Sequence, residues 1–143
     1  MIELLKSVHD ALQSGIDWVR DANVFYADDF DLLPEHVTFP ATGIRDGGRA
    51  NNIEAQDAYE RIDRVEVCAY VLNFRPETLV DDAGVLALSA AVESVLLDNT
   101  LADSLNAMLA WVEKVNRSEL FVNANNEPVM RQISTIAYHR WEQ

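Results

Sequence analysis

The chain has 143 residues, of which 49% are hydrophobic and 24% are charged, a composition typical of one globular domain. This excludes a disordered or collagen-like chain, and the single cysteine, Cys68, excludes a disulfide framework. Eleven Lys and Arg residues against 24 Asp and Glu residues give a net charge of −13, so the surface repels nucleic acids and anionic membranes.

No apolar run is long enough to cross a membrane, and the first residues lack the basic and apolar regions of a signal peptide. We therefore expect a soluble, intracellular protein that folds as a single domain over residues 1–143. The acidic residues are spread along the chain and form no acidic tail, so the charge belongs to the folded surface.

Residues 2–15 predict an amphipathic helix that packs on a core. The side chains on its packing face recur at steps of three and four residues: Ile2, Leu5, Val8 or His9, and Leu12. Gly15 comes at the end of this pattern, and glycine accepts the left-handed backbone conformation that often follows a helix.

Residues 22–27 predict a short strand, and residues 37–44 predict a second strand that Pro40 interrupts. Because proline donates no ladder hydrogen bond, we expect this second strand at a sheet edge or at a bulge. The segment between the two strands predicts an acidic loop that exposes apolar side chains; its residues are Asp28, Asp29, Phe30, Asp31, Leu32 and Leu33.

Residues 45–57 are rich in glycine and asparagine and have no hydrophobic pattern, which predicts a long, mobile loop. The next segment, residues 61–74, predicts a long strand with two apolar faces. One face carries Val65, Val67, Ala69 and Val71, and the other carries Glu66, Cys68, Tyr70, Leu72 and Phe74. A strand that is apolar on both faces is expected at the centre of a sheet, with both faces covered.

The C-terminal half predicts a helix, a segment of ambiguous pattern and a final strand. Residues 82–98 predict the helix, with an apolar face formed by Val85, Leu88, Val92, Val95 and Leu96. Residues 101–116 fit both a helical face and an alternating strand, and the pattern leaves both open. Residues 123–128 predict a turn, and the β-branched and aromatic residues of 129–141 favour a strand.

Few residues fit a catalytic or metal-binding pattern. Cys68 lies in the most apolar strand and is expected to be a small core residue, and the three histidines are scattered along the chain. The glycine-rich stretch at residues 43–49 lacks the Gly-Lys-Ser/Thr ending of a phosphate loop. Carboxylates at 28, 29 and 31 are of the kind that bind Mg²⁺ or Ca²⁺, but the glycine and distant glutamate of a calcium loop are missing. We expect no catalytic residue, no cofactor and no metal ligand.

Exposed aromatic and leucine side chains on an acidic loop instead favour a protein that binds other proteins. The order of segments points to one family. Its distinctive parts are the helix at the start, the Phe-Pro-x-x-Gly-Ile turn at residues 39–44, the glycine-rich stretch before residues 64–67, the helix end at residues 96–101, and the closing segments at residues 127–129 and 137–141. Over almost the whole chain, this order resembles the tail terminator (tail completion) proteins of long-tailed bacteriophages.

The resemblance implies an α+β fold, with an antiparallel sheet flanked by helices, and a strand at about residues 105–116. It implies no enzymatic activity and a structural role in the virion: six copies form a ring at the head-proximal end of the tail, assembled in the host cytoplasm. The ring ends polymerisation of the tail tube protein and offers a surface to the neck or head-completion protein. DNA passes through the acidic lumen without specific binding, since like charges repel.

In such an assembly we expect the partner interface to include the acidic loop together with two arginines of the glycine-rich stretch: Asp28, Asp29, Phe30, Asp31, Leu32, Leu33, Arg45 and Arg49. Arg45 and Arg49 are expected to meet acidic groups of a neighbouring copy as residues 45–58 become ordered. Two alternatives remain: a head–tail joining (neck) protein, and a small acidic, metal-dependent enzyme.

Overall fold

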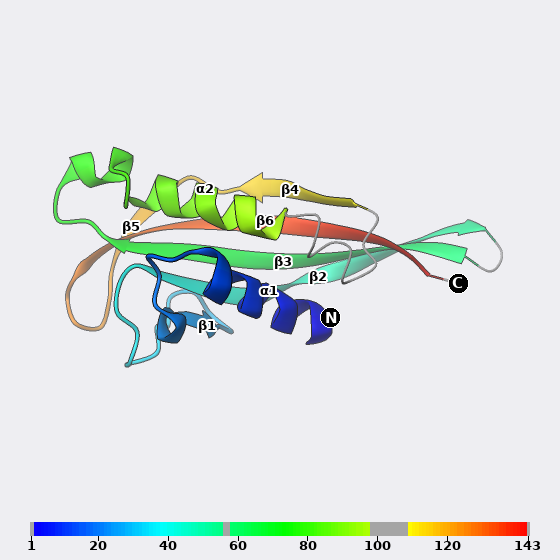
Figure 1. The fold of residues 1–143 in the computed structure, drawn as a ribbon, viewed down its shortest axis with the longest axis horizontal. Helices are drawn as coiled ribbons and strands as arrows, with labels where there is room; N and C mark the ends of the chain where they lie inside the picture. The colour runs from blue at the N-terminus through cyan, green and yellow to red at the C-terminus, as the bar shows by residue number, and fades with distance from the viewer. Residues whose placement is uncertain (1, 56–57, 98–108, 143) are drawn as a thin grey trace.

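The computed structural model describes residues 2–55, 58–97 and 109–142 and has an α+β fold, as the sequence predicts (Figure 1). In these residues, two helices and a mixed sheet of six strands make up the fold. In chain order the elements are α1 (Ile2–Gly15), β1 (Val24–Tyr26), β2 (Ala41–Ala55), β3 (Ala58–Leu72), α2 (Val85–Leu96), β4 (Leu109–Val115), β5 (Glu119–Val122) and β6 (Pro128–Glu142), with short 3₁₀ turns at Asp21–Asn23 and Pro76–Val80.

The sheet has the strand order β1-β2-β3-β6-β4, and β5 pairs with the beginning of β6. All neighbouring pairs are antiparallel except β1 and β2, which run parallel. The predicted central strand is confirmed, because β3 lies between β2 and β6 along nearly its whole length.

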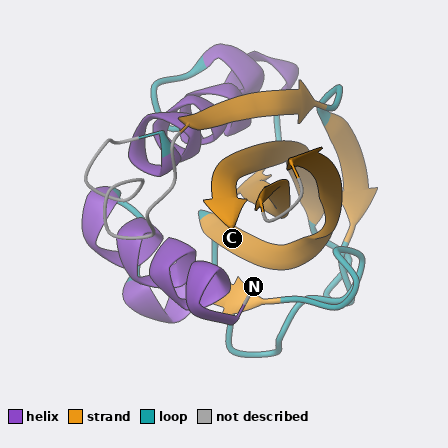
Figure 2. Ribbon diagram, turned by 90° about the vertical axis from the view of Figure 1, so that its right-hand side faces the viewer, coloured by secondary structure: helices purple, strands orange, loops and turns teal. Residues whose placement is uncertain are grey.

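Both helices lie on the same side of this twisted, curled sheet (Figure 2). They cover an aliphatic core to which β3 contributes the predicted face, Val65, Val67, Ala69 and Val71, and α2 contributes Val85, Leu88, Val92 and Leu96. The buried face of α1 is slightly rotated from the prediction: Leu4, Val8 and Leu12 are buried, while Ile2 is 72% exposed.

Gly15 has a different role from the one predicted. Its backbone is not left-handed; instead, a Cβ at this position would lie 2.7 Å from Cγ2 of Val95. Carbon atoms do not approach so closely, so the missing side chain allows α1 to pack tightly against α2.

Residues 45–55 are the largest departure from the sequence-based prediction. They form the second half of β2, paired with β3 as far as Ala55, whereas a mobile loop was expected over residues 45–57; residues 56 and 57 lie outside the described part. A register shift between Asp46 and Gly48 marks a bulge, and Gly48 adopts a positive φ of 94°, which glycine accepts without strain.

β2 begins only after Pro40, whose peptide bond with Phe39 is cis. The predicted strand at residues 37–44 is therefore correct only from Ala41 onward. The strand is internal, between β1 and β3, and its bulge lies beyond Pro40.

In the C-terminal half, α2, the turn after Val122 and the long final strand β6 are confirmed. The ambiguous segment is a strand from Leu109 to Val115; its residues 101–108 lie outside the described part. β4 and β5 follow one another along the same side of β6, separated by residues 116–118. Among the described residues, no further strand pairs with β4 or β5, so together they form a free edge of the sheet.

Candidate partner-binding surface

The acidic loop, residues 27–39, completes a second core on the face of the sheet opposite the helices. Buried side chains in this core are Phe25, Phe30, Ala41, Cys68, Tyr70 and Val129. The predicted exposure of Phe30 is therefore wrong: its side chain is 2% exposed. The aromatic ring lies close to Gly43, which has no side chain: a Cβ there would lie 3.0 Å from the ring of Phe25 and 3.4 Å from that of Phe30.

Phe30 is held at both its backbone and its ring. Its carbonyl oxygen accepts hydrogen bonds from the hydroxyl of Tyr70, at 2.7 Å, and from Nη1 of Arg131, at 3.1 Å. The guanidinium of Arg45 lies over the ring, 4.2 Å from its centroid. A cation above an aromatic face is attracted by the ring quadrupole.

Arg131 of β6 joins the acidic loop to the far edge of the sheet. Its guanidinium pairs with Asp31 of the loop and with Glu119 of β5, the latter at 2.7 Å, and it lies 4.6 Å from the centroid of Phe121. Burial opposes the charged form of Arg131, but the hydrogen bonds to Asp31 and Glu119 raise its pKa above the ordinary value. Arg131, a residue of the same chain, thus holds the acidic loop on the sheet, and this contact requires no cation from a neighbouring copy.

Cys68 is a core residue, as predicted. Burial raises the pKa of its thiol to about 12, so the nucleophilic thiolate is not formed near neutral pH. Burial also raises the pKa of the Tyr70 hydroxyl, which stays protonated and serves as a hydrogen-bond donor.

Arg45 and Arg49, predicted to meet a neighbour, are paired within the chain. Arg45 bonds Glu66 across β2 and β3 at 3.1 Å, and Arg49 bonds the fully buried Asp63 at 2.9 Å. Arg61 approaches the same carboxylate at 3.0 Å. These arginines offset buried or half-buried carboxylates, which is why polar residues are tolerated along the two strands.

The exposed part of the predicted interface is therefore smaller than expected. The exposed residues are Asp28, Asp29, Asp31, Leu32 and Arg49, with Leu32 at 71%, and Leu33 is half-buried against the second core. Of these, Asp31 and Arg49 are paired within the chain. Oδ1 of Asp29 accepts a hydrogen bond from the backbone N–H of Asp31 at 2.8 Å, which shapes the turn that presents Leu32.

A second exposed surface lies on the free edge formed by β4 and β5, and the sequence analysis missed it. Val115, Leu120 and Val122 are 40%, 56% and 58% exposed. A cleft of about 390 Å³, here called the edge cleft, lies beside β5 and is lined by Arg117, Ser118, Glu119, Leu120 and Met130. The apolar run Leu120–Val122 is a strand signal, but only the pairing shows that the strand is at an edge.

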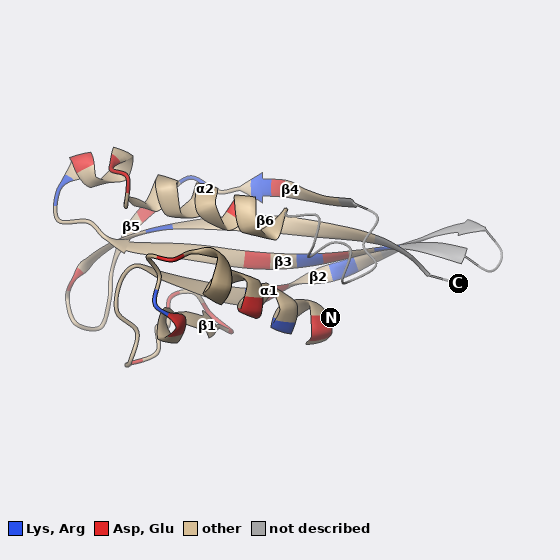
Figure 3. Ribbon diagram, viewed as in Figure 1, with Lys and Arg blue, Asp and Glu red and all other residues tan. Residues whose placement is uncertain are grey.

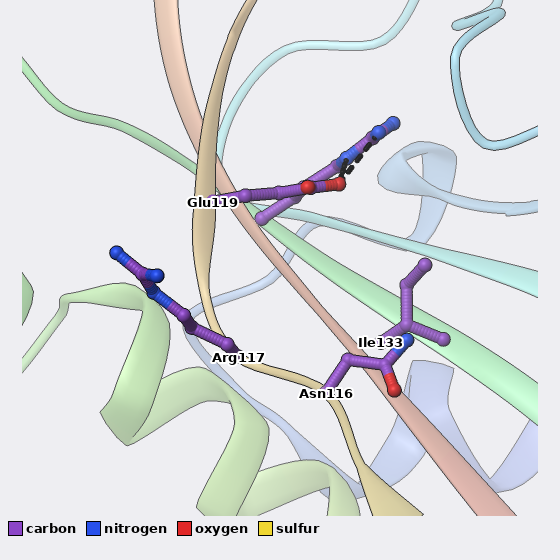
Figure 4. A pocket seen from close by; sticks show the side chains of 5 residues that line it. Asn116, Arg117, Glu119 and Ile133 are labelled. Carbon is purple, nitrogen blue, oxygen red and sulfur yellow. Dashed lines mark hydrogen bonds and ion pairs between the residues drawn. The ribbon is translucent and has the colours of Figure 1, made fainter.

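Arg117 also borders a smaller hollow with Asn116, Glu119 and Ile133, where its side chain extends away from the other labelled residues (Figure 4). Within the part of the chain that the structure describes, no carboxylate pairs with Arg117 or with the exposed Lys114. The edge therefore carries two cations that are not neutralised in the described part of the chain.

Charge is divided unevenly between the sheet and the rest of the chain. The six strands contain seven Lys and Arg and eight Asp and Glu, a net charge of −1, which leaves four basic and 16 acidic residues, net −12, for the remainder. Figure 3 shows basic and acidic residues near one another on the strands. One ion pair between strands joins Arg64 of β3 to Glu113 of β4 at 2.6 Å. Most of the acidity thus lies on helices, turns and loops.

The histidines are part of the structure around them. Nε2 of His9 lies 3.2 Å from the carbonyl oxygen of Val24, Nε2 of His36 lies 3.1 Å from that of Ala22, and His139 packs edge-on against Trp111. Among the described residues, no group of three His, Cys, Asp or Glu side chains is placed to hold a metal ion. No helix in the described ranges is long and apolar enough to span a membrane.

No protein-family model matches the sequence, and a search of curated proteins finds no significant relative.

Proposed function

We propose that this protein is a structural subunit of a bacteriophage tail, a tail terminator that closes the finished tube as a ring. The ring ends polymerisation of the tail tube protein and presents a surface for the neck or head-completion protein. In this proposal the chain is not an enzyme, and its task is to make contacts with other subunits in the virion.

The observation that carries the proposal is the length of the central strands. β2, β3 and β6 each span 15 residues, and the hairpin of β2 and β3 continues beyond the two helices as a projecting arm (Figure 1). A hairpin that extends beyond the body of a domain presents strand surface to other molecules. A protein that acts as a single subunit does not need such a surface. A subunit of a ring uses such an arm to contact its neighbour.

The distribution of charge supports the same role. A ring of six copies would carry −78, because each copy carries −13. Most of that charge lies outside the strands, so a lumen lined by helices, turns or loops would repel phosphate and let DNA pass without sticking.

The proposal is tested by electron microscopy of the purified protein mixed with tail tubes of the phage or prophage that encodes it. We expect a ring at one end of each tube and an arrest of tube growth. A variant in which an Asn-Gly turn replaces residues 52–60, joining the register partners Asn51 and Arg61, should lose ring formation while keeping its circular dichroism spectrum.

A matched control is Ser14→Ala, a change at an exposed position of α1, which should cap tubes like the unmodified protein. Binding to purified heads or neck complexes, with none to tubes, would contradict the terminator proposal and favour a neck protein. Turnover that requires a divalent cation would favour the enzyme alternative.

A further inference from the structure

We infer that the edge cleft beside β5 binds residues 28–35 of the acidic loop from a second copy of this chain. The inference goes beyond the proposed function, because it rests on the surface chemistry of two described regions and holds whether or not the protein caps a phage tail. It assigns a partner to the exposed leucine of the loop and to the cleft arginine that no carboxylate of the described residues neutralises.

The cleft has an apolar wall and a cationic rim. Leu120, 56% exposed, and the half-buried Met130 form the wall, and Arg117 forms the rim. No carboxylate within the described ranges neutralises this guanidinium, and Glu119, its neighbour in the cleft, is engaged by Arg131. The site therefore suits a ligand with an aliphatic side chain next to a carboxylate.

The acidic loop presents that combination. Leu32 is 71% exposed, and Asp28 and Glu35 are exposed on either side of it in the sequence. The loop is already fixed in place, because Phe30 is buried beneath it and Asp31 pairs with Arg131. A segment that is ordered before binding loses little conformational entropy on docking.

Charge complementarity favours a second copy over an unrelated acidic protein as the occupant. In a chain of net charge −13, Lys114 and Arg117 are the cations on the sheet edge that remain unpaired in the described part of the chain. One subunit carries both regions near the β5 edge: Arg131 links Asp31 of the loop to Glu119, while the cleft wall of Leu120 and Met130 lies on the helix side of the sheet. A two-fold contact uses the same two patches on both copies, so a second copy related by a two-fold axis makes two loop-to-cleft contacts at once.

The first test is sedimentation velocity over a concentration series at about 0.1 M salt, where the Debye length is about 10 Å and contact pairs still act. We expect the unmodified chain to self-associate. Arg117→Glu should weaken association by roughly tenfold or more, because the cleft then repels the loop. Arg20→Glu, the same change at another exposed arginine, is the matched control and should leave association unchanged.

The decisive test uses complementary charge reversal. The double variant Asp28→Lys, Glu35→Lys should also fail to associate, since a basic loop meets a basic cleft. Mixing it with the Arg117→Glu variant should restore association, because each loop now meets a cleft of opposite charge. Asp29 is left unchanged in this design, as it shapes the turn.

Leu32→Ser tests the apolar half of the contact and should weaken association without altering circular dichroism. Three results would each overturn the inference: an unmodified chain that stays monomeric over the whole series, association that Arg117→Glu leaves intact, or no recovery on mixing the two charge variants. Tube capping is measured separately, so either proposal can fail while the other stands.

Discussion

The two faces of the sheet are covered in different ways. On one face, two helices bury aliphatic side chains such as Leu88 and Val92 against the aliphatic face of β3. On the other, an irregular loop buries aromatic rings such as Phe30 and Tyr70 and is fastened by ion pairs and hydrogen bonds to Arg131. The first layer depends on area removed from water, and the second depends also on polar contacts between residues far apart in the chain.

The comparison predicts that the helix side supplies more of the stability. Leu88→Ala removes a fully buried side chain and should lower the free energy of unfolding by about 3 kcal/mol, through lost transfer energy and a residual cavity. Urea unfolding followed by circular dichroism measures the loss. An unchanged midpoint would show that α2 is not packed on the sheet as described.

The loop side should respond to alkaline pH through Cys68. The unfolded thiol ionises near its ordinary pKa of 9.0, whereas the buried thiol keeps its proton until about 12. Between pH 9 and pH 12, unfolding therefore releases the proton of this thiol. The contribution of Cys68 to stability is constant below this range and falls as the pH rises through it. At about pH 11, two units above the ordinary pKa, the loss of stability is roughly 3 kcal/mol.

Urea midpoints measured from neutral to alkaline pH check this effect. Cys68→Ala should make the alkaline decline shallower without removing it, because burial also raises the pKa of Tyr70 and Tyr138. Equal slopes for the variant and the unmodified chain would argue against a buried thiol on the loop side.

Arg131→Met should loosen the acidic loop while leaving the helix side intact. The change removes the bonds to Asp31, Glu119 and the Phe30 carbonyl, and we expect a loss of about 2 kcal/mol, since both carboxylates remain partly hydrated. Hydrogen exchange should rise in residues 27–39 and stay unchanged in α1 and α2. Uniform acceleration over the whole chain would mean that the two layers do not behave independently.

Leu32→Ser should have the smallest effect on the isolated subunit. Leu32 is largely exposed, so the free energy of unfolding should change by no more than about 0.5 kcal/mol. Thermal unfolding at a concentration too low for association is the appropriate measurement. A larger loss would show that Leu32 belongs to the core of its own subunit.

The helix-side layer follows from local patterns in the sequence. Helical periodicity identifies α2, and alternation identifies the buried faces of β3, because side chains that face one core recur with the period of their element. The predicted face of α1 is less accurate, since Leu4 and Ile2 are both apolar and only tertiary packing decides which of them is buried.

The loop-side layer and the second half of β2 did not follow from such patterns. Residues 45–55 resemble a loop because they are rich in glycine and asparagine and have no hydrophobic pattern, yet cross-strand partners such as Glu66 and Asp63 neutralise Arg45 and Arg49. Phe30 resembles an exposed loop residue because its neighbours are aspartates, and its burial depends on Tyr70 and Arg131, which are distant in sequence.

The sequence by itself determined the α+β class, the two helices, the central strand and the acidic character of the surface, since these depend on composition and on local periodicity. Tertiary structure alone decided which strand is an edge and which loop residues are covered. It also decided which charges are already paired, because these properties depend on contacts between segments far apart in the chain. Arg117 and Arg131 show this difference: no local pattern tells them apart as paired or unpaired, but in the described part of the molecule only Arg131 has carboxylates from two other segments within reach.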